Sequence, residues 1–268
     1  MNLVDKLLKG GLIGAHRGHR ANFPENTMAA FQDCPGRCDF IELDVRFSSD
    51  GVPLVFHDHT LERTTNIHRC GLFPGREDHR IETFSYAELQ HLDLGSWFYD
   101  ADPYGQIAAG QALVPAIDER RQTIPDLDSV LTFIRDNNLG VNVEIKSLHK
   151  NTLASALKII QSIREHRLLD QCVISAFDHS ILKLLKRQDS DITTAALVEG
   201  YHPDQLEHYL GDIGVSGYHI SDDLAKPELF ERLQKSGFFV SVYTVNCPER
   251  KQALIDMGAG AVITDFLD

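Results

Sequence analysis

Short apolar segments rich in β-branched residues recur along the chain and alternate with segments of helical periodicity. Strands are predicted at 11–15, 39–45, 52–57, 141–145, 172–176, 192–198, 216–220, 238–243 and 260–263. Helices are predicted at 26–33, 127–137, 151–167, 178–188, 203–210, 226–236 and 247–257. Strands that alternate with helices of this length predict an α/β protein with a parallel sheet, and six such units in succession favour a closed (β/α)8 TIM barrel.

An open doubly wound sheet is the alternative arrangement of alternating strands and helices. Such a sheet usually carries a glycine-rich phosphate loop after its first strand. Here His16-Arg17-Gly18 occupies that position, and the chain contains neither GxGxxG nor GxxxxGK[ST]. The sequence therefore favours the barrel.

Nine predicted strands exceed the eight of a barrel, and the junction at 47–51 accounts for the difference. This junction is far too short for a parallel crossover, which needs a dozen or more residues. It contains Asp50-Gly51 between two apolar segments, which is a strong hairpin signal. Strand 52–57 is therefore predicted to run antiparallel to strand 39–45.

The hairpin also predicts which residues face each other. With the turn centred near Ser49-Asp50, His57 lies opposite Glu42 and Val55 lies opposite Asp44. This pairing brings His57 beside two carboxylates.

Residues 59–125 contain few regular strands and several glycines and prolines. A structureless loop of this length is improbable inside a compact domain. We therefore predict a subdomain inserted after the hairpin, with a helix near 84–93, that covers part of the barrel mouth. The whole chain, 1–268, is predicted to be one barrel domain that contains this insertion.

Composition narrows the class of protein. A hydrophobic content of 43% without an apolar stretch near 18 residues indicates a soluble globular protein, with no integral membrane association. The N-terminus lacks the uninterrupted apolar stretch of a signal peptide, and the five cysteines form no close CxxC pair, so a reducing cytoplasm is predicted. A net charge of −13 argues against nucleic acid as a partner.

Carboxylates stand near the ends of two predicted strands. Glu42 and Asp44 are two residues apart, so in a strand they point to the same side. Glu144 repeats the situation on the strand 141–145. A structural salt-bridge pair is the alternative reading, but it would desolvate two carboxylates together. Three carboxylates without a convergent thiolate favour Mg²⁺ or Ca²⁺ over zinc.

Two histidines and two cations complete the candidate site. His16 and His57 each follow an apolar segment, and two imidazoles can supply a base and an acid for proton transfer near neutral pH. The residues alone do not say which is which. Arg17 offers planar donors to a phosphate oxygen, whereas Lys146 shares a face with Glu144 and can neutralise developing phosphorane charge. The alternative for Arg17 is a surface ion pair, and the alternative for Lys146 is a simple ion pair with Glu144.

The chain resembles the glycerophosphodiester phosphodiesterase family of the bacterial cytoplasmic type. The motifs that carry the resemblance occur in the family's order and span residues 12 to 265: His16-Arg17-Gly18, Pro24-Glu25-Asn26-Thr27, Glu42-Leu43-Asp44, His57-Asp58, Gly95-Ser96-Trp97-Phe98, Ile124-Pro125-Asp126-Leu127, Val143-Glu144-Ile145-Lys146, Thr244-Val245-Asn246 and Ile263-Thr264-Asp265. A lone His-Arg-Gly would be weak evidence, but so many ordered motifs are specific.

The resemblance implies metal-dependent hydrolysis of small glycerophosphodiesters, such as glycerophosphocholine or glycerophosphoethanolamine, to sn-glycerol 3-phosphate and an alcohol. It further implies that His16 is the base and His57 the acid, and that the glycerol 2-hydroxyl attacks phosphorus, with direct attack by water as the alternative. Two other functions remain open: a lysophospholipase D acting on longer lipids, and a barrel that binds phosphodiesters without turnover. The insertion is predicted to be a lid that selects the headgroup through its polar stretch 100–119.

Overall fold

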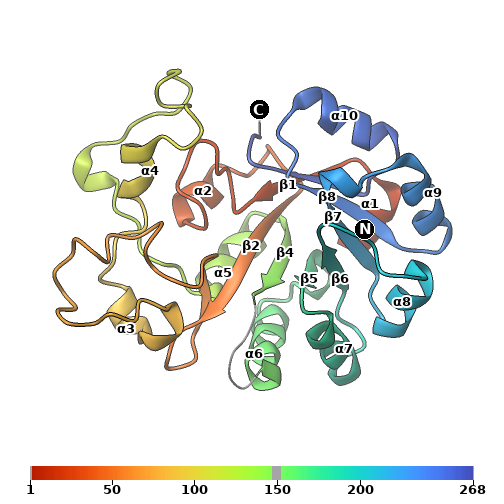
Figure 1. The fold of residues 1–268 in the computed structure, drawn as a ribbon, viewed down its shortest axis with the longest axis horizontal. Coiled ribbons are helices and arrows are strands. Elements are labelled where there is room, and N and C mark those ends of the chain that lie inside the picture. The colour runs from red at the N-terminus through yellow and green to blue at the C-terminus, as the bar shows by residue number, and fades with distance from the viewer. Residues whose placement is uncertain (1, 147–151, 268) are drawn as a thin grey trace.

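Eight parallel strands close into a barrel in the computed structural model, which describes residues 2–146 and 152–267 (Figure 1). The barrel strands are β1 (Leu12–His16), β2 (Phe40–Phe47), β4 (Gly140–Ile145), β5 (Cys172–Ala176), β6 (Thr194–Val198), β7 (Gly217–Ser221), β8 (Phe239–Tyr243) and β9 (Ala261–Thr264). Strand β1 pairs with both β9 and β2, which closes the sheet. The predicted (β/α)8 barrel is therefore confirmed.

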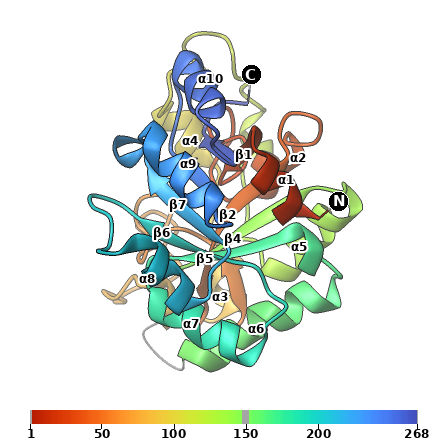
Figure 2. The same ribbon diagram turned by 90° about the vertical axis from the view of Figure 1, so that its right-hand side faces the viewer.

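The predicted helices lie outside the barrel, where they cover the strands (Figures 1 and 2). They are α2 (Met28–Gln32), α5 (Leu127–Asp136), α6 (Thr152–Glu165), α7 (His179–Gln188), α8 (Leu206–Ile213), α9 (Pro227–Lys235) and α10 (Pro248–Asp256). Helix α8 begins three residues after the predicted start, because Gln205 adopts a left-handed conformation with φ 48° and ends the preceding loop. No helix in the described part of the chain is both long and apolar enough to cross a bilayer.

A short N-terminal helix, α1 (Leu3–Lys9), was not predicted. The Asn2 side chain accepts a hydrogen bond from the Asp5 backbone N–H at 2.8 Å and so caps this helix. Its apolar face buries Leu3 and Leu7 in a cluster with residues of several barrel strands, among them Phe40 and Phe239. These two phenylalanines lie at or next to the amino ends of β2 and β8, so α1 covers the end of the barrel opposite to the carboxyl ends of the strands.

The hairpin after β2 forms as predicted, but the predicted register differs from the observed one by one residue. Strand β3 (Pro53–Val55) runs antiparallel to β2 and places Val55 opposite Val45, not opposite Asp44. The turn is centred on Asp50, since Ser48 N–H bonds Val52 O at 3.1 Å. The strand therefore ends before His57, which is instead held at the rim by a 2.7 Å hydrogen bond from Arg46 Nε to its carbonyl oxygen.

The insertion follows this hairpin and lies to the left of the barrel in Figure 1. It contains the helices α3 (Tyr86–Leu89) and α4 (Ser96–Ala101) and the 3-10 helices η1 (Ile81–Thr83) and η2 (Ile117–Glu119). The helix predicted near 84–93 is thus only four residues long, capped by Ser85. A separate hydrophobic cluster stabilises the insertion, built on buried residues such as Leu61, Phe84 and Leu92. The predicted inserted subdomain is therefore present.

One buried histidine inside the barrel predicts a dependence of stability on pH. His219 lies on β7 with 2% of its surface exposed, and burial lowers its pKa to about 3 from an ordinary 6.5. The pKa of His219 is lower in the folded protein than in the unfolded chain. As the pH falls from about 6.5 toward 3, the unfolded chain therefore takes up a proton that the folded protein does not, and the folded protein loses stability. The free energy of unfolding should therefore fall by up to about 1.4 kcal/mol per pH unit through this one group.

Denaturant titrations of the wild type and of His219→Gln at several pH values between 7 and about 4 measure this effect. The variant should show the shallower decline, because glutamine takes up no proton. Equal slopes for both proteins would contradict the prediction.

Candidate active site

Three buried carboxylates converge at the carboxyl ends of β2 and β4. Glu42 and Asp44 point to the same side of β2, and the parallel register places Asp44 opposite Glu144. One oxygen of each carboxylate lies within 4.8 Å of the other two. Their exposed fractions are only 4%, 1% and 8%. The structure thus brings together all three residues that were predicted to bind a metal.

The electrostatics of this cluster favour a cation. Burial, and then the charges of Asp44 and Glu144, raise the pKa of Glu42 well above its usual value. Burial and Asp44 raise the pKa of Glu144 to about 7. Burial also opposes ionisation of Asp44, but Arg17 and Lys146 outweigh it and lower the pKa of this carboxyl. Oxygen donors with unfavourable mutual repulsion suit a hard divalent cation, so the residues present fit such a metal.

Arg17 and Lys146, predicted to bind phosphate, both contact the carboxylate cluster. Arg17 Nε lies 3.2 Å from Asp44 Oδ2, and its Nη1 donates to Glu25 Oε1 at 2.8 Å. Lys146 Nζ lies 2.9 Å from Asp44 Oδ1 and also donates to Glu144. Both cations therefore offset negative charge at this site.

His16 ends β1, and a carboxylate that was not predicted orients it. Its Nδ1 lies 2.7 Å from Asp265 Oδ1, and Asn246 holds the other oxygen of that carboxylate at 2.8 Å. Burial lowers the pKa of His16, and this effect outweighs the opposing hydrogen bond to Asp265. With Nδ1–H given to Asp265, a neutral His16 leaves Nε2 free to accept a proton.

His57 has a similar partner. Its Nδ1 lies 2.6 Å from Asp58 Oδ1, and Arg63 from the insertion donates to both oxygens of Asp58. Burial opposes ionisation of Asp58, but the hydrogen bonds from His57 and Arg63 outweigh it and lower its pKa. Phe56, the residue before His57, donates its backbone N–H to the carbonyl oxygen of Asp44 at 2.9 Å, so the backbone places His57 next to β2.

A buried glutamate links these groups. Glu25 accepts from Arg17 and from Arg63, and its other oxygen lies 3.0 Å from Arg20. Burial opposes its ionisation, but the arginines outweigh it and lower the pKa of Glu25 to about 2. Sequence reasoning gave Glu25 no firm role and missed Arg20 and Arg63. Nothing in the sequence signals that residues so far apart share one carboxylate.

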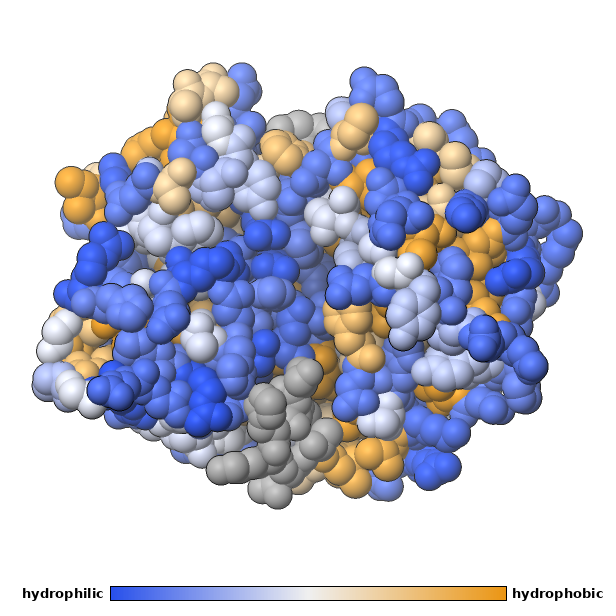
Figure 3. Space-filling model, viewed as in Figure 1, coloured by the Kyte–Doolittle hydropathy of each residue, from blue (hydrophilic) through white to orange (hydrophobic). Residues whose placement is uncertain are grey.

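A small pocket opens at this end of the barrel. It is lined by His16, Glu42, Asn142, Glu144, Leu197, His219, Tyr243 and Ile263. His57 is not part of this lining. Figure 3 shows that the surface on this view is mostly hydrophilic, including the hollow between the insertion and the barrel.

The model of the glycerophosphoryl diester phosphodiesterase family matches residues 16–268. The chain belongs to this family. Its carboxylate cluster agrees with the assignment, because family members generally depend on a divalent metal. The family also confirms the predicted enzyme class, a phosphoric diester hydrolase.

Individual relatives cover nearly the whole chain. A glycerophosphodiester phosphodiesterase from Caldanaerobacter subterraneus is 30% identical over 257 residues, which is 95% of this chain and 93% of the relative. One from Bacillus altitudinis is 28% identical over 260 residues, 96% of this chain and 95% of the relative. A phosphodiesterase from Oleispira antarctica, solved with its product sn-glycerol-3-phosphate, superimposes with a TM-score of 0.80 at 25% identity, covering 96% of this chain and 94% of that one.

Proposed function

We propose that this phosphodiesterase hydrolyses small glycerophosphodiesters, such as glycerophosphocholine or glycerophosphoethanolamine, to sn-glycerol 3-phosphate and the free alcohol. The observation that carries the proposal is the convergence of Glu42, Asp44 and Glu144, two of which line the same pocket as His16. The product bound to the Oleispira relative supports glycerol phosphate as the common part of the substrates.

Glu42, Asp44 and Glu144 would hold Mg²⁺ or Ca²⁺, both of which prefer oxygen ligands. When bound, such an ion polarises a phosphoryl oxygen and lowers the pKa of a nearby hydroxyl. Arg17 and Lys146 lie against the same carboxylates and would bind the phosphate oxygens. Their positive charges also counter the repulsion that a protein of charge −13 exerts on an anionic substrate.

The first step transfers the phosphoryl group within the substrate. His16 Nε2 accepts the proton of the glycerol 2-hydroxyl while that oxygen bonds to phosphorus, and Asp265 holds the imidazole in the required tautomer. The bond from phosphorus to the headgroup oxygen breaks, and His57 donates a proton to the departing alkoxide. Asp58 and Arg63 keep the His57 ring in place.

The second step opens the resulting cyclic phosphate. His57, now deprotonated, accepts a proton from the attacking water, and the protonated His16 returns its proton to the glycerol 2-oxygen. Both histidines thus recover their starting states, and the product is sn-glycerol 3-phosphate. Direct attack by water in a single step is the alternative, and detection of a cyclic intermediate separates the two.

Two other functions remain as alternatives. A lysophospholipase D needs an apolar groove for an acyl chain, but the hollow in Figure 3 is mostly hydrophilic. A barrel that only binds phosphodiesters would tolerate loss of a histidine or carboxylate, yet all of them are retained.

We propose a single domain, 1–268, acting in the cytoplasm on a small-molecule substrate. The five unpaired thiols agree with a reducing compartment.

Release of glycerol 3-phosphate from a panel of glycerophosphodiesters and lysophospholipids, with and without EDTA, tests the proposal. We expect rapid, EDTA-sensitive turnover of the short diesters. Preference for lysophospholipids would favour the lysophospholipase D, and binding without turnover would favour the non-catalytic barrel.

The insertion supports a prediction about headgroup selection. Tyr104 from the insertion packs 5.7 Å from the Phe266 ring and beneath the Arg20 guanidinium, so this part of the lid reaches the site. Because the headgroup varies while glycerol phosphate does not, the varying end should face the insertion. The sequence predicts that the stretch 100–119 selects the headgroup. Tyr104 contacts the site and 106–116 follows it, so the two can be tested by separate variants.

Replacing 106–116 by a short linker and, separately, making Tyr104→Ala should each raise KM and shift relative rates among headgroups. The affinity for the divalent metal should hardly change, because neither variant alters a residue of the carboxylate cluster. Steady-state kinetics on the substrate panel measures this. Unchanged KM and headgroup preference in both variants would show that the insertion has only a structural role.

A further inference from the structure

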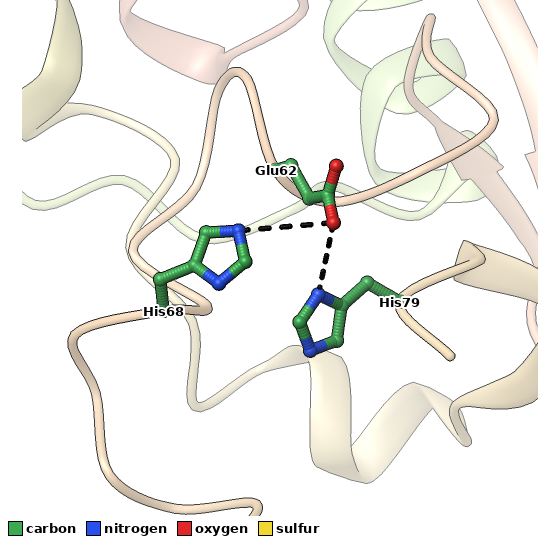
Figure 4. Close-up of side chains that lie close together, drawn as sticks. All are labelled: Glu62, His68 and His79. Carbon is green, nitrogen blue, oxygen red and sulfur yellow. Dashed lines mark hydrogen bonds and ion pairs between the residues drawn. The ribbon is translucent and has the colours of Figure 1, made fainter. Parts of the chain in front are cut away.

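A second group of potential metal ligands lies in the insertion, apart from the carboxylate site. The side chains of Glu62, His68 and His79 converge from three points of an irregular segment (Figure 4). In Figure 4 a nitrogen of each imidazole is directed at the same oxygen of Glu62. His79 Nδ1 lies 3.1 Å from this Oε1 and His68 Nε2 lies 3.7 Å from it.

The spacing of these atoms suits a small transition-metal ion. All three donor atoms lie within 4.8 Å of one another. Tetrahedral zinc with bonds near 2.0–2.1 Å separates its ligand atoms by roughly 3.3 Å. The distances from Glu62 Oε1 to the two imidazole nitrogens, 3.1 and 3.7 Å, are close to that value, and the separation of the two nitrogens is at most 4.8 Å.

The hydrogen bond on the far side of His79 supports the same interpretation. His79 Nε2 lies 3.0 Å from the carbonyl oxygen of Arg76. A carbonyl only accepts, so Nε2 carries the hydrogen, and in a neutral ring Nδ1 then presents a lone pair to Glu62. Two acceptors facing each other at 3.1 Å need either a proton or a metal ion between them. A ligating histidine whose other N–H is held by a carbonyl is the usual arrangement around protein-bound metals.

The backbone holds these residues in position. Thr60 and Arg80 form a β-bridge, and Leu61 N–H donates to the His79 carbonyl oxygen at 3.0 Å, so Glu62 and His79 lie on paired segments. The His68 and His79 rings pack edge to face at 4.9 Å. The backbone therefore fixes Glu62 and His79 relative to each other, and the ring contact places the exposed His68 beside them.

We propose that Glu62, His68 and His79 bind a transition-metal ion of the zinc class, with a remaining coordination position open to solvent. Two imidazoles and one carboxylate select such an ion, whereas the oxygen-only site of Glu42, Asp44 and Glu144 selects Mg²⁺ or Ca²⁺. Glu62 precedes Arg63, which holds Asp58 and Glu25. The ion would thus stabilise the segment of the insertion that contacts the active site.

The test uses the full-length protein, freed of metal and then saturated with Mg²⁺ so that the carboxylate site is filled. Binding of Zn²⁺ is measured by calorimetry, and Co²⁺ serves as a probe whose visible absorption reports coordination. The wild type should bind one tight equivalent of Zn²⁺ and gain thermal stability. His68→Ala and His79→Ala should each weaken this binding by at least about tenfold, and the double variant should lose it.

Two control variants make the result specific. His208→Ala removes an exposed histidine that faces Asp212 on α8 without a second imidazole, and it should bind Zn²⁺ as the wild type does. Glu42→Gln should lose Mg²⁺ affinity and keep the Zn²⁺ equivalent. Circular dichroism and cooperative melting verify that the variants are folded. Equal Zn²⁺ binding and equal thermal shifts in the wild type and the folded double variant would overturn the proposal and leave a protonated His79 paired with Glu62.

Discussion

Replacing His16 or His57 by alanine is expected to reduce turnover of glycerophosphocholine by about two to four orders of magnitude. This is the usual contribution of one positioned group to proton transfer. The structure gives each imidazole the support that such a group needs, since Asp265 bonds His16 Nδ1 at 2.7 Å and Asp58 bonds His57 Nδ1 at 2.6 Å. Steady-state rates of the two variants measure the loss.

The leaving group separates the roles of the two histidines. If His57 protonates the departing alkoxide, an acidic leaving group such as nitrophenol needs little of that help. His57→Ala should then retain relatively more activity on a nitrophenyl ester than on glycerophosphocholine, whereas His16→Ala should be impaired on both. Equal losses on both substrates would contradict the assignment of acid and base.

A matched control tests whether loss of any partly buried histidine has the same effect. His179 lies on α7, where its ring bonds the Tyr209 hydroxyl at 2.7 Å and the Leu197 carbonyl at 2.9 Å. His179→Gln should keep most of the turnover, because this histidine has no carboxylate partner in these contacts. A comparable loss in this variant would mean that the His16 and His57 effects reflect damage to the fold.

The barrel could be predicted because its signals are local and repeated. Buried parallel strands appear as short continuous apolar segments, and the helices between them carry an apolar face. Helix α1 has only Leu3 and Leu7 buried, too short a pattern to distinguish from a disordered end. The hairpin register failed for a different reason, since the hydrogen bonds of Ser48 set the centre of the turn and its composition does not reveal them.

The site residues on or next to strands could be predicted from the sequence, whereas those in irregular segments of the insertion could not. Glu42, Asp44 and Glu144 lie on strands, where a period of two fixes the side to which they point. Asp265 follows β9 just as His16 ends β1, so the rule that chemistry gathers at the carboxyl ends of barrel strands could have found it. Arg63, His68 and His79 lie in irregular segments of the insertion, where spacing along the sequence says nothing about proximity in space.

The carboxylate site predicts that removing metal abolishes activity. Chelation should stop turnover, and added Mg²⁺ or Ca²⁺ should restore it. Glu42→Gln, Asp44→Asn and Glu144→Gln should each weaken metal affinity by at least about tenfold and remove most of the activity, because each replaces an anionic ligand with a neutral one. Full turnover in EDTA after extensive dialysis would exclude the site.

Glu144→Gln should raise the thermal stability of the protein when metal is absent, although it weakens metal binding. Burial and Asp44 raise the pKa of Glu144 to about 7, above an ordinary 4.5. A raised carboxyl pKa favours the folded state below about 4.5, and this contribution is lost as the pH rises through 7. At pH 8 without metal, Glu144→Gln should therefore melt at a higher temperature than the wild type, whereas saturating Mg²⁺ should stabilise the wild type more than the variant. Thermal melts with EDTA and with Mg²⁺ measure this reversal, and a variant that melts lower in both conditions would show that Glu144 stabilises the fold without a cation.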